Sequence, residues 1–180
     1  MENVADCMFC DIAQKTDKSI LKANNKFVVI KDIKPHAKHH YLVISKTHIS
    51  KITDVKASDI ELIKSMESLG RAYLRAILKD EGEADIVEDM LRVGFHQPPM
   101  VSVKHLHMHI LYPINSMGLI NRHIVFRPGR FFKSATDVMV EMEKNLLQED
   151  NNTNIAKETK KEHEAKASPQ ELRDCIANNQ

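Results

Sequence analysis

Cysteine is scarce in this 180-residue sequence, which has three: Cys7, Cys10 and Cys175. An odd and sparse set does not suit a disulfide-stapled secreted scaffold, so we expect reduced thiols. Charge of one sign is also lacking, because 26 basic residues stand against 25 acidic ones. A chain this close to neutral has no broad attraction for nucleic acid or membranes, and we do not expect nucleic acid as a partner.

Long apolar runs and glycine-rich loops are missing too. No run approaches the length of a membrane span, and the opening residues MENVADCMFC do not combine a basic segment with an apolar core. We therefore expect no membrane association and a cytoplasmic location, with the nucleus open to so small a chain. Without a glycine-rich phosphate loop, a nucleotide would have to be held in another way.

Strand-like runs on both sides of one strong helix predict a mixed α+β domain around an antiparallel sheet of about five strands. The length suits one domain better than two. Strands are expected on both sides of a turn at Asn24 and Asn25, and over residues 39–44, 90–95 and 103–112.

The long helix is predicted over residues 58–79, where apolar side chains recur at helical spacing. Ser58 and Glu61 stand at the spacing of a capping box at its start. A second, C-terminal helix is expected over residues 136–147, with Ser134 as its cap.

The last part of the chain is polar and nearly free of large apolar residues, so it buries too little surface to offset its ordering entropy. We predict a globular domain over residues 1–147 and a flexible tail over residues 148–180. One short helix is expected in the tail, over residues 169–176.

The stretch KHLHMHIL has a histidine at every second position. In a strand alternate side chains share a face, so His105, His107 and His109 would line one side and the apolar residues the other. A solvated polar face normally mixes residue types, which favours a chemically active face. A single metal ion is the other alternative, but same-face neighbours about 6.6–6.8 Å apart do not all reach one ion.

The run HLHMHIL resembles the signature of the histidine triad (HIT) superfamily of nucleotide hydrolases and transferases. CMFC and IKDIKPHAKHHYLVISKTHIS lie in the order and at the spacings of its histidine triad nucleotide-binding (Hint) branch. The resemblance covers residues 7–113 and is greatest to the third member of that branch. It implies the HIT fold and a homodimer.

The resemblance also implies catalytic roles. His107 would attack the α-phosphate of a nucleotide, as a neutral imidazole can near pH 7, and water would resolve the nucleotidyl-histidine. His109 would bind the phosphate or help protonate the departing group, while His105 and His40 would orient the nucleophile. Ser102 matches the family serine and is expected to contact the leaving group.

Nucleotide binding is assigned to Asp32 for the ribose and Ile33 for the base, again by resemblance, together with Ser102, His107 and His109. Judged without the family, an aspartate before a proline-containing turn is more often a turn residue than a ligand.

Some relatives hold a structural zinc ion with a CxxC pair and two histidines, which here would be Cys7, Cys10, His48 and His105. The alternative is that both thiols pack as small hydrophobic groups. A redox CxxC is less favoured without a preceding strand and a following helix. Catalysis itself is expected to need no cofactor.

Some positions depart from the usual Hint pattern. Gly94 stands where that branch has an asparagine, and Met100 and Val101 replace a Gly-Gln pair. GFHQPPMVSVKHLHMHI also resembles the HIT domain of aprataxin, a DNA-adenylate hydrolase that depends on a C-terminal zinc finger. Here Cys175 is the single cysteine after the triad.

We therefore expect a hydrolase that cleaves the P–N bond of adenosine 5'-monophosphoramidates, through a covalent AMP-histidine, to AMP and an amine. A DNA-5'-adenylate hydrolase of aprataxin type is one alternative. A weakly active nucleotide-binding sensor or scaffold is another. The arginines within INRHIVFRPGRFF are interpreted as solvated turn residues.

Overall fold

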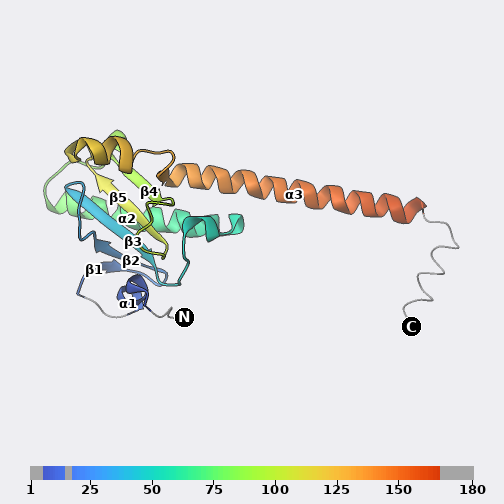
Figure 1. The fold of residues 1–180 in the computed structure, drawn as a ribbon, viewed down its shortest axis with the longest axis horizontal. Coiled ribbons are helices and arrows are strands. Elements are labelled where there is room, and N and C mark those ends of the chain that lie inside the picture. The colour runs from blue at the N-terminus through green and yellow to red at the C-terminus, as the bar shows by residue number, and fades with distance from the viewer. Residues whose placement is uncertain (1–5, 15–17, 167–180) are drawn as a thin grey trace. The chain divides into compact units, whose positions relative to one another are not determined.

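The computed structural model describes residues 6–14 and 18–166 and shows one six-stranded antiparallel sheet, ordered β1-β2-β3-β5-β4-β6 (Figure 1). The strands are β1 (Ile20–Ala23), β2 (Phe27–Lys31), β3 (His39–Ser45), β4 (Arg92–His96), β5 (His107–Tyr112) and β6 (Phe132–Ser134). The α+β class and the antiparallel sheet are confirmed, with one short strand, β6, beyond the predicted five.

The three α-helices are α1 (Met8–Gln14), α2 (Ile60–Asp80) and α3 (Ala135–Lys166). Helix α2 confirms the predicted long helix, but the predicted capping box is wrong. A 3-10 turn over residues 57–59 leads into α2, Asp59 makes no capping hydrogen bond through its side chain, and Glu61 pairs with Lys64 instead. Among the described residues no helix is both long and apolar enough to cross a bilayer.

Helix α3 begins as predicted, because the Ser134 hydroxyl accepts a hydrogen bond from the N–H of Asp137 at 3.0 Å. The chain divides into two compact units after Met142. In the second unit α3 continues to Lys166, past the predicted end at residue 147. A polar segment needs no core to be helical, since a helix satisfies its own backbone. The short helix predicted over residues 169–176 lies outside the described residues.

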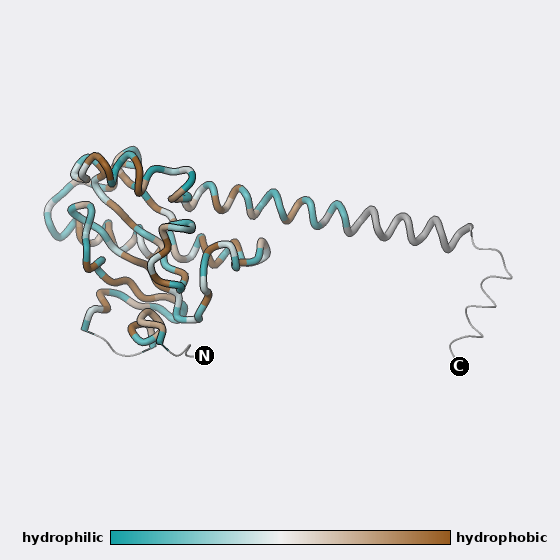
Figure 2. Tube along the Cα trace, in the orientation of Figure 1, coloured by the Kyte–Doolittle hydropathy of each residue, from teal (hydrophilic) through white to brown (hydrophobic). Residues whose placement is uncertain are grey.

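The sheet buries apolar side chains on both faces, and its central strands are among the most hydrophobic segments in Figure 2. Helix α2 packs on one face in a cluster that includes Val43, Met66, Leu74, Met108 and Ile110. Helix α1 packs on the other face through Phe9 and Ala13, against Val28, Ile30, Leu42 and Ile44. Because strand residues alternate, His40 shares the face of Leu42 and Ile44, opposite α2.

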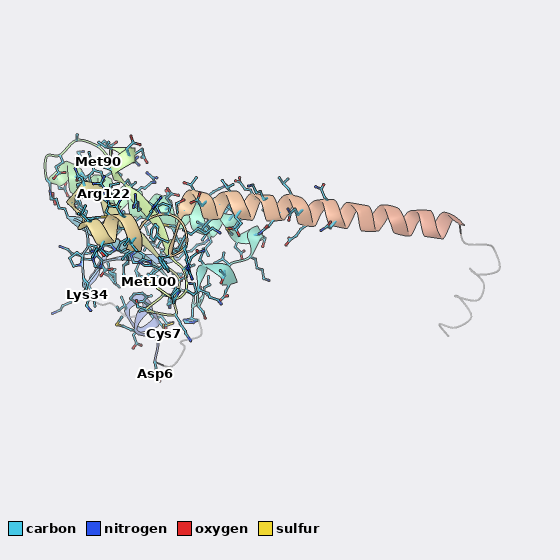
Figure 3. All side chains as sticks on the ribbon, turned by 45° about the horizontal axis from the view of Figure 1, so that its top comes forward. Asp6, Cys7, Lys34, Met90, Met100 and Arg122 are labelled. Carbon is cyan, nitrogen blue, oxygen red and sulfur yellow. The ribbon has the colours of Figure 1, made fainter. Side chains whose placement is uncertain are left out.

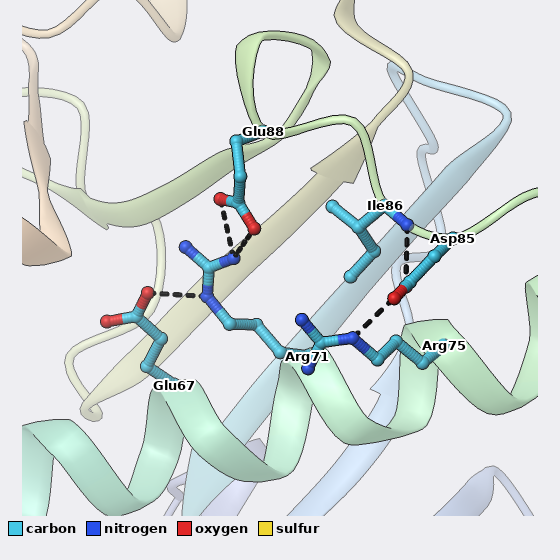
Figure 4. Close-up of polar contacts among 6 residues, drawn as sticks. All are labelled: Glu67, Arg71, Arg75, Asp85, Ile86 and Glu88. Carbon is cyan, nitrogen blue, oxygen red and sulfur yellow. Dashed lines mark hydrogen bonds and ion pairs between the residues drawn. The ribbon is translucent and has the colours of Figure 1, made fainter.

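Ion pairs hold the segment after α2 against that helix (Figure 4). Arg71 donates to Glu67 at 2.7 Å and to both oxygens of Glu88, and Arg75 donates to Asp85 at 3.1 Å. These contacts fix where the chain leaves α2 and enters β4.

Candidate active site

Strand β5 begins at His107, so two of the three alternating histidines lie on it. His105 lies just before the strand but still shares the predicted face, because its ring and that of His107 both pack against Phe9 of α1. The carbonyl of Leu106 still accepts from the N–H of Ser45 at 3.2 Å, while its own N–H donates to the carbonyl of Ile49 at 2.6 Å, so the regular ladder with β3 starts only at His107. The apolar residues between the histidines do pack towards α2, as predicted.

His107 has a fixed neutral form. Its Nδ1 lies 2.6 Å from the carbonyl oxygen of His105, and a carbonyl can only accept, so Nδ1 carries the proton and Nε2 keeps its lone pair. Burial lowers the pKa of His107, which keeps the ring neutral at pH 7. The nucleophile is therefore oriented by a backbone carbonyl, whereas the sequence predicted the side chains of His105 and His40.

His40 is fully buried and orients His109 instead, with 2.9 Å between Nε2 of His40 and Nδ1 of His109. The backbone N–H of His36 donates to Nδ1 of His40 at 3.2 Å, which places the proton of the neutral ring on Nε2. Burial lowers the pKa of His40 to about 4, and it lowers the pKa of His109 well below the usual value.

The second ring nitrogen of His109 has no such partner. Because Nδ1 of His109 accepts from His40, its Nε2 carries the proton, and this atom is buried without a hydrogen-bond partner among the described residues. The rings of His107 and His109 have centroids 5.1 Å apart. The site thus places an unused N–H donor beside a nucleophilic nitrogen.

Asp32 both shapes its turn and reaches the histidines. Its Oδ1 accepts the N–H of Lys34 at 2.8 Å, and its Oδ2 lies 3.4 Å from Nε2 of His40. Next to it, Ile33 is 84% exposed and offers a free apolar surface. Ser102 is exposed on the loop before β5 and makes no hydrogen bond with any described residue, so its role stays a prediction.

Phe126 and His96 belong to the site and were not predicted. Phe126 follows a π-helical turn, Asn121–Val125, and its ring lies 5.6 Å from that of His40 and 4.8 Å from that of His96. The ring of His96, at the end of β4, lies 4.7 Å from that of His109. A histidine two residues after Gly94 was a usable signal, but nothing local marks Phe126.

An open cavity of about 480 Å³ lies next to a small recess that His107 lines. Its lining comes from the segment after β3 and the loop before β5, whose Met100 is labelled in Figure 3. Ser50, Lys51 and Val101 line both this cavity and the small recess that reaches His107. A leaving group bound there would lie close to the nucleophile.

The four predicted metal ligands, Cys7 (Figure 3), Cys10, His48 and His105, come together, with their donor atoms all within 4.8 Å of one another. Nδ1 of His105 lies 3.4 Å and 3.5 Å from the two sulfurs, and Nδ1 of His48 lies 3.3 Å from Cys10. In tetrahedral zinc the S···N separation is about 3.6 Å. Nε2 of His105 donates to the Ser45 carbonyl at 2.7 Å, which leaves its Nδ1 lone pair towards the thiols, so the group fits zinc.

Comparison with known proteins gives concordant matches. Residues 6–124 match the family described as "Scavenger mRNA decapping enzyme C-term binding". "Adenosine 5'-monophosphoramidase HINT3" of Xenopus tropicalis is 32% identical over 137 residues, which cover 75% of this chain and 85% of the relative. The protein of the same name from Danio rerio is 40% identical over 113 residues, 62% of this chain and 67% of the relative.

Among solved structures, a histidine triad protein from Clostridium difficile is 26% identical, with a TM-score of 0.51 over 62% of this chain and 93% of that one. The family match extends over most of the chain and contains the whole alternating-histidine run. The resemblance inferred from the sequence is confirmed: the chain belongs to the histidine triad superfamily.

Proposed function

We propose that this protein is an adenosine 5'-monophosphoramidase, which hydrolyses the P–N bond of its substrate to release AMP and an amine. The names of the relatives from Xenopus tropicalis and Danio rerio support this substrate class. The observation that carries the proposal is the 2.6 Å hydrogen bond from Nδ1 of His107 to the His105 carbonyl. It holds the other ring nitrogen unprotonated, as a nucleophile requires.

In the first step Nε2 of His107 attacks phosphorus, the P–N bond breaks, and the amine leaves with the bonding electron pair and takes up a proton from solvent, which the attacking water of the second step returns. The Nε2–H of His109 would donate to a phosphoryl oxygen as charge develops there. The carbonyl of His105 keeps its bond to Nδ1–H, which stabilises the positive charge on the AMP-bearing ring. Water then attacks phosphorus, AMP leaves, and the neutral imidazole returns.

Binding of the nucleotide is assigned to the surface beside the triad. Asp32 would accept hydrogen bonds from the ribose hydroxyls through Oδ2, whose partner is His40, and exposed Ile33 would cover the base. The amine would enter the cavity beside Val101, and Ser102 on the same loop would contact it.

The proposal is tested with a fluorogenic adenosine phosphoramidate. His107→Ala should lower the turnover number by about 10³-fold or more, because the covalent step is lost. The matched control is His123→Ala, since His123 is exposed on the turn before Phe126. Equal rates for the wild type and His107→Ala would reject the enzyme. A rapid quench should yield an adenylylated peptide containing residue 107.

Two alternatives are separated by parallel assays. Tight binding of AMP with no turnover of any substrate would favour a nucleotide sensor. Faster hydrolysis of a 5'-adenylated nicked duplex than of the phosphoramidate would favour a DNA-adenylate hydrolase. The near-neutral charge of the chain argues against DNA as the main substrate.

We also propose that Cys7, Cys10, His48 and His105 hold a structural zinc ion, supported by their mutual distances. Bound zinc would tie α1 to the segments around β3 and β5, and no reaction step needs it. Elemental analysis should find at least one zinc per chain, and Cys10→Ser should lower the zinc content by about one per chain. A metal content that Cys10→Ser leaves unchanged would contradict the assignment.

The remaining proposals rest on the family. We infer a homodimer, for which light scattering at micromolar concentration should give twice the monomer mass; a monomer mass would refute it. We also propose a cytoplasmic and nuclear location, which imaging of a tagged chain would test.

A further inference from the structure

His39 is the first residue of β3 and lies on the α2 side of the sheet, opposite His40. It is only 3% exposed, and its Nδ1 lies 3.4 Å from the hydroxyl of Tyr41. Its Nε2 is buried and has no hydrogen-bond partner within the described part of the chain. A buried imidazole nitrogen without a partner is costly unless something else binds it.

Two carboxylates meet this nitrogen at the C-terminal end of α2. Glu81 directly follows the helix, and Glu83 lies two residues on, after Gly82 at a φ of 72°. Oε2 of Glu81 is 3.7 Å from Nε2 of His39, and one donor atom from each of His39, Glu81 and Glu83 lies within 4.8 Å of the others. The negative end of the helix dipole adds to the attraction for a cation.

A cation already lies beside this cluster. The ammonium group of Lys38 donates to Glu81 at 2.9 Å and also contacts Glu83. The side chains of Lys38 and Glu81 are 49% and 40% exposed, and exposed ion pairs of this kind contribute little to stability. A stronger cation could therefore displace the lysine, whose long side chain can swing into solvent.

We propose that His39, Glu81 and Glu83 form a binding site for a divalent metal ion of the zinc type, separate from the cysteine cluster. The observed N···O distance of 3.7 Å is close to the separation of about 3.4 Å between nitrogen and oxygen ligands of tetrahedral zinc. Three protein ligands leave the fourth position for water. Burial lowers the pKa of His39, so the ligand is neutral at pH 7 and binds without losing a proton.

Such an ion would fasten the end of α2 and the following turn to the first residue of β3. It takes no part in the proposed hydrolysis, because His39 pairs with Tyr112 on the α2 face of the sheet, whereas His107 pairs with Ile44 on the α1 face. A test of this metal site therefore does not depend on whether the proposed hydrolase activity is correct.

Cobalt(II) distinguishes this site from the cysteine cluster, because thiolate ligands add an intense near-ultraviolet charge-transfer band that nitrogen and oxygen ligands lack. The full-length chain is first loaded with one equivalent of zinc and then titrated with cobalt. We expect visible bands of a nitrogen–oxygen site, without the thiolate band. Glu81→Gln and Glu83→Gln, both at exposed positions, should each weaken cobalt binding by about tenfold or more.

Lys38→Met provides a test of opposite sign, because it removes the competing ammonium and should tighten cobalt binding by about tenfold. His39→Gln should abolish the bands, with circular dichroism as the check on folding. The proposal is overturned if no nitrogen–oxygen bands appear. It is equally overturned if the bands persist in Glu81→Gln and Glu83→Gln, since the ion would then lie elsewhere, for example at Asp32, His40 and His109.

Discussion

His40 makes a hydrogen bond through each of its ring nitrogens. Together these two bonds determine which ring nitrogen of His109 carries the proton. Replacing His40 by alanine removes the donor to Nδ1 of His109, so the proton of His109 is no longer held on Nε2. We expect His40→Ala to lower the turnover number on the phosphoramidate by about 10–100-fold, as measured by steady-state kinetics. The melting temperature shows whether the variant is folded.

The matched control is His36→Ala. His36 acts on His40 through its backbone N–H, which alanine keeps, although its ring also packs 5.4 Å from that of Phe126. The loss of activity should therefore be much smaller than in His40→Ala. A similar loss in both variants would show that ring packing matters more than the hydrogen bond.

The candidate site could be predicted in part, and the parts that could were those with a local pattern. His107 and His109 alternate along one strand, and the CxxC pair with His48 and His105 keeps recognisable spacings. The neighbours Phe126 and Ser45 could not be found, because they come from separate segments that meet only when the sheet is formed, whereas His96 had a signal in its position two residues after Gly94. The backbone contact to His107 also left no trace in the sequence, since any residue at position 105 has a carbonyl.

The pairing of β4 with β6 requires a residue without a side chain at Gly94. At Gly94 an added Cβ would lie 2.1 Å from the carbonyl oxygen of Lys133 and 2.8 Å from the ring of Phe132. The Hint asparagine at this position would not fit, which accounts for that departure from the pattern. We expect Gly94→Ala to lower the free energy of unfolding by about 2–3 kcal/mol, measured by urea denaturation.

Gly118→Ala is the control for that change, because no atom lies within 4 Å of an added Cβ at Gly118. It should alter the free energy of unfolding by about 0.5 kcal/mol or less. If both variants were equally stable, β6 would not pack on β4 as described.

Elements with clear periodicity were predictable and short ones were not. Helix α2 and strands β2 and β3 have long apolar patterns, whereas β6 has three residues and α1 seven. Capping residues gave mixed results: Ser134 caps α3, but a 3-10 turn replaces the cap expected from Ser58. Local hydrogen bonds of similar strength compete at a helix start, and the surrounding chain decides between them.

At the scale of the molecule, buried histidine makes the fold sensitive to acid. Burial is the largest cause of a lowered pKa for six histidines, 39, 40, 96, 105, 107 and 109. The unfolded chain binds protons at these rings as the pH falls through about 6.5, while the folded chain does not. Stability should therefore be full above about pH 6.5 and fall progressively towards the pKa of His40, about 4.

Urea denaturation at about pH 7.5, 6 and 5 checks this dependence. His40→Gln should make it less steep, because one ring that resists protonation is gone. Equal unfolding free energies at the highest and lowest of these pH values would contradict the burial of these rings.

Strands β3 and β5 are the central pair of the six-strand order, and they supply His40, His107 and His109. Inner strands are usually the last to exchange their amide hydrogens with solvent, whereas outer strands and chain ends open first. The reactive imidazoles therefore lie in the part of the domain that is expected to open last. Fraying at β1 or β6 would leave them in place, so a denaturant should abolish turnover at the same concentration at which the whole domain melts.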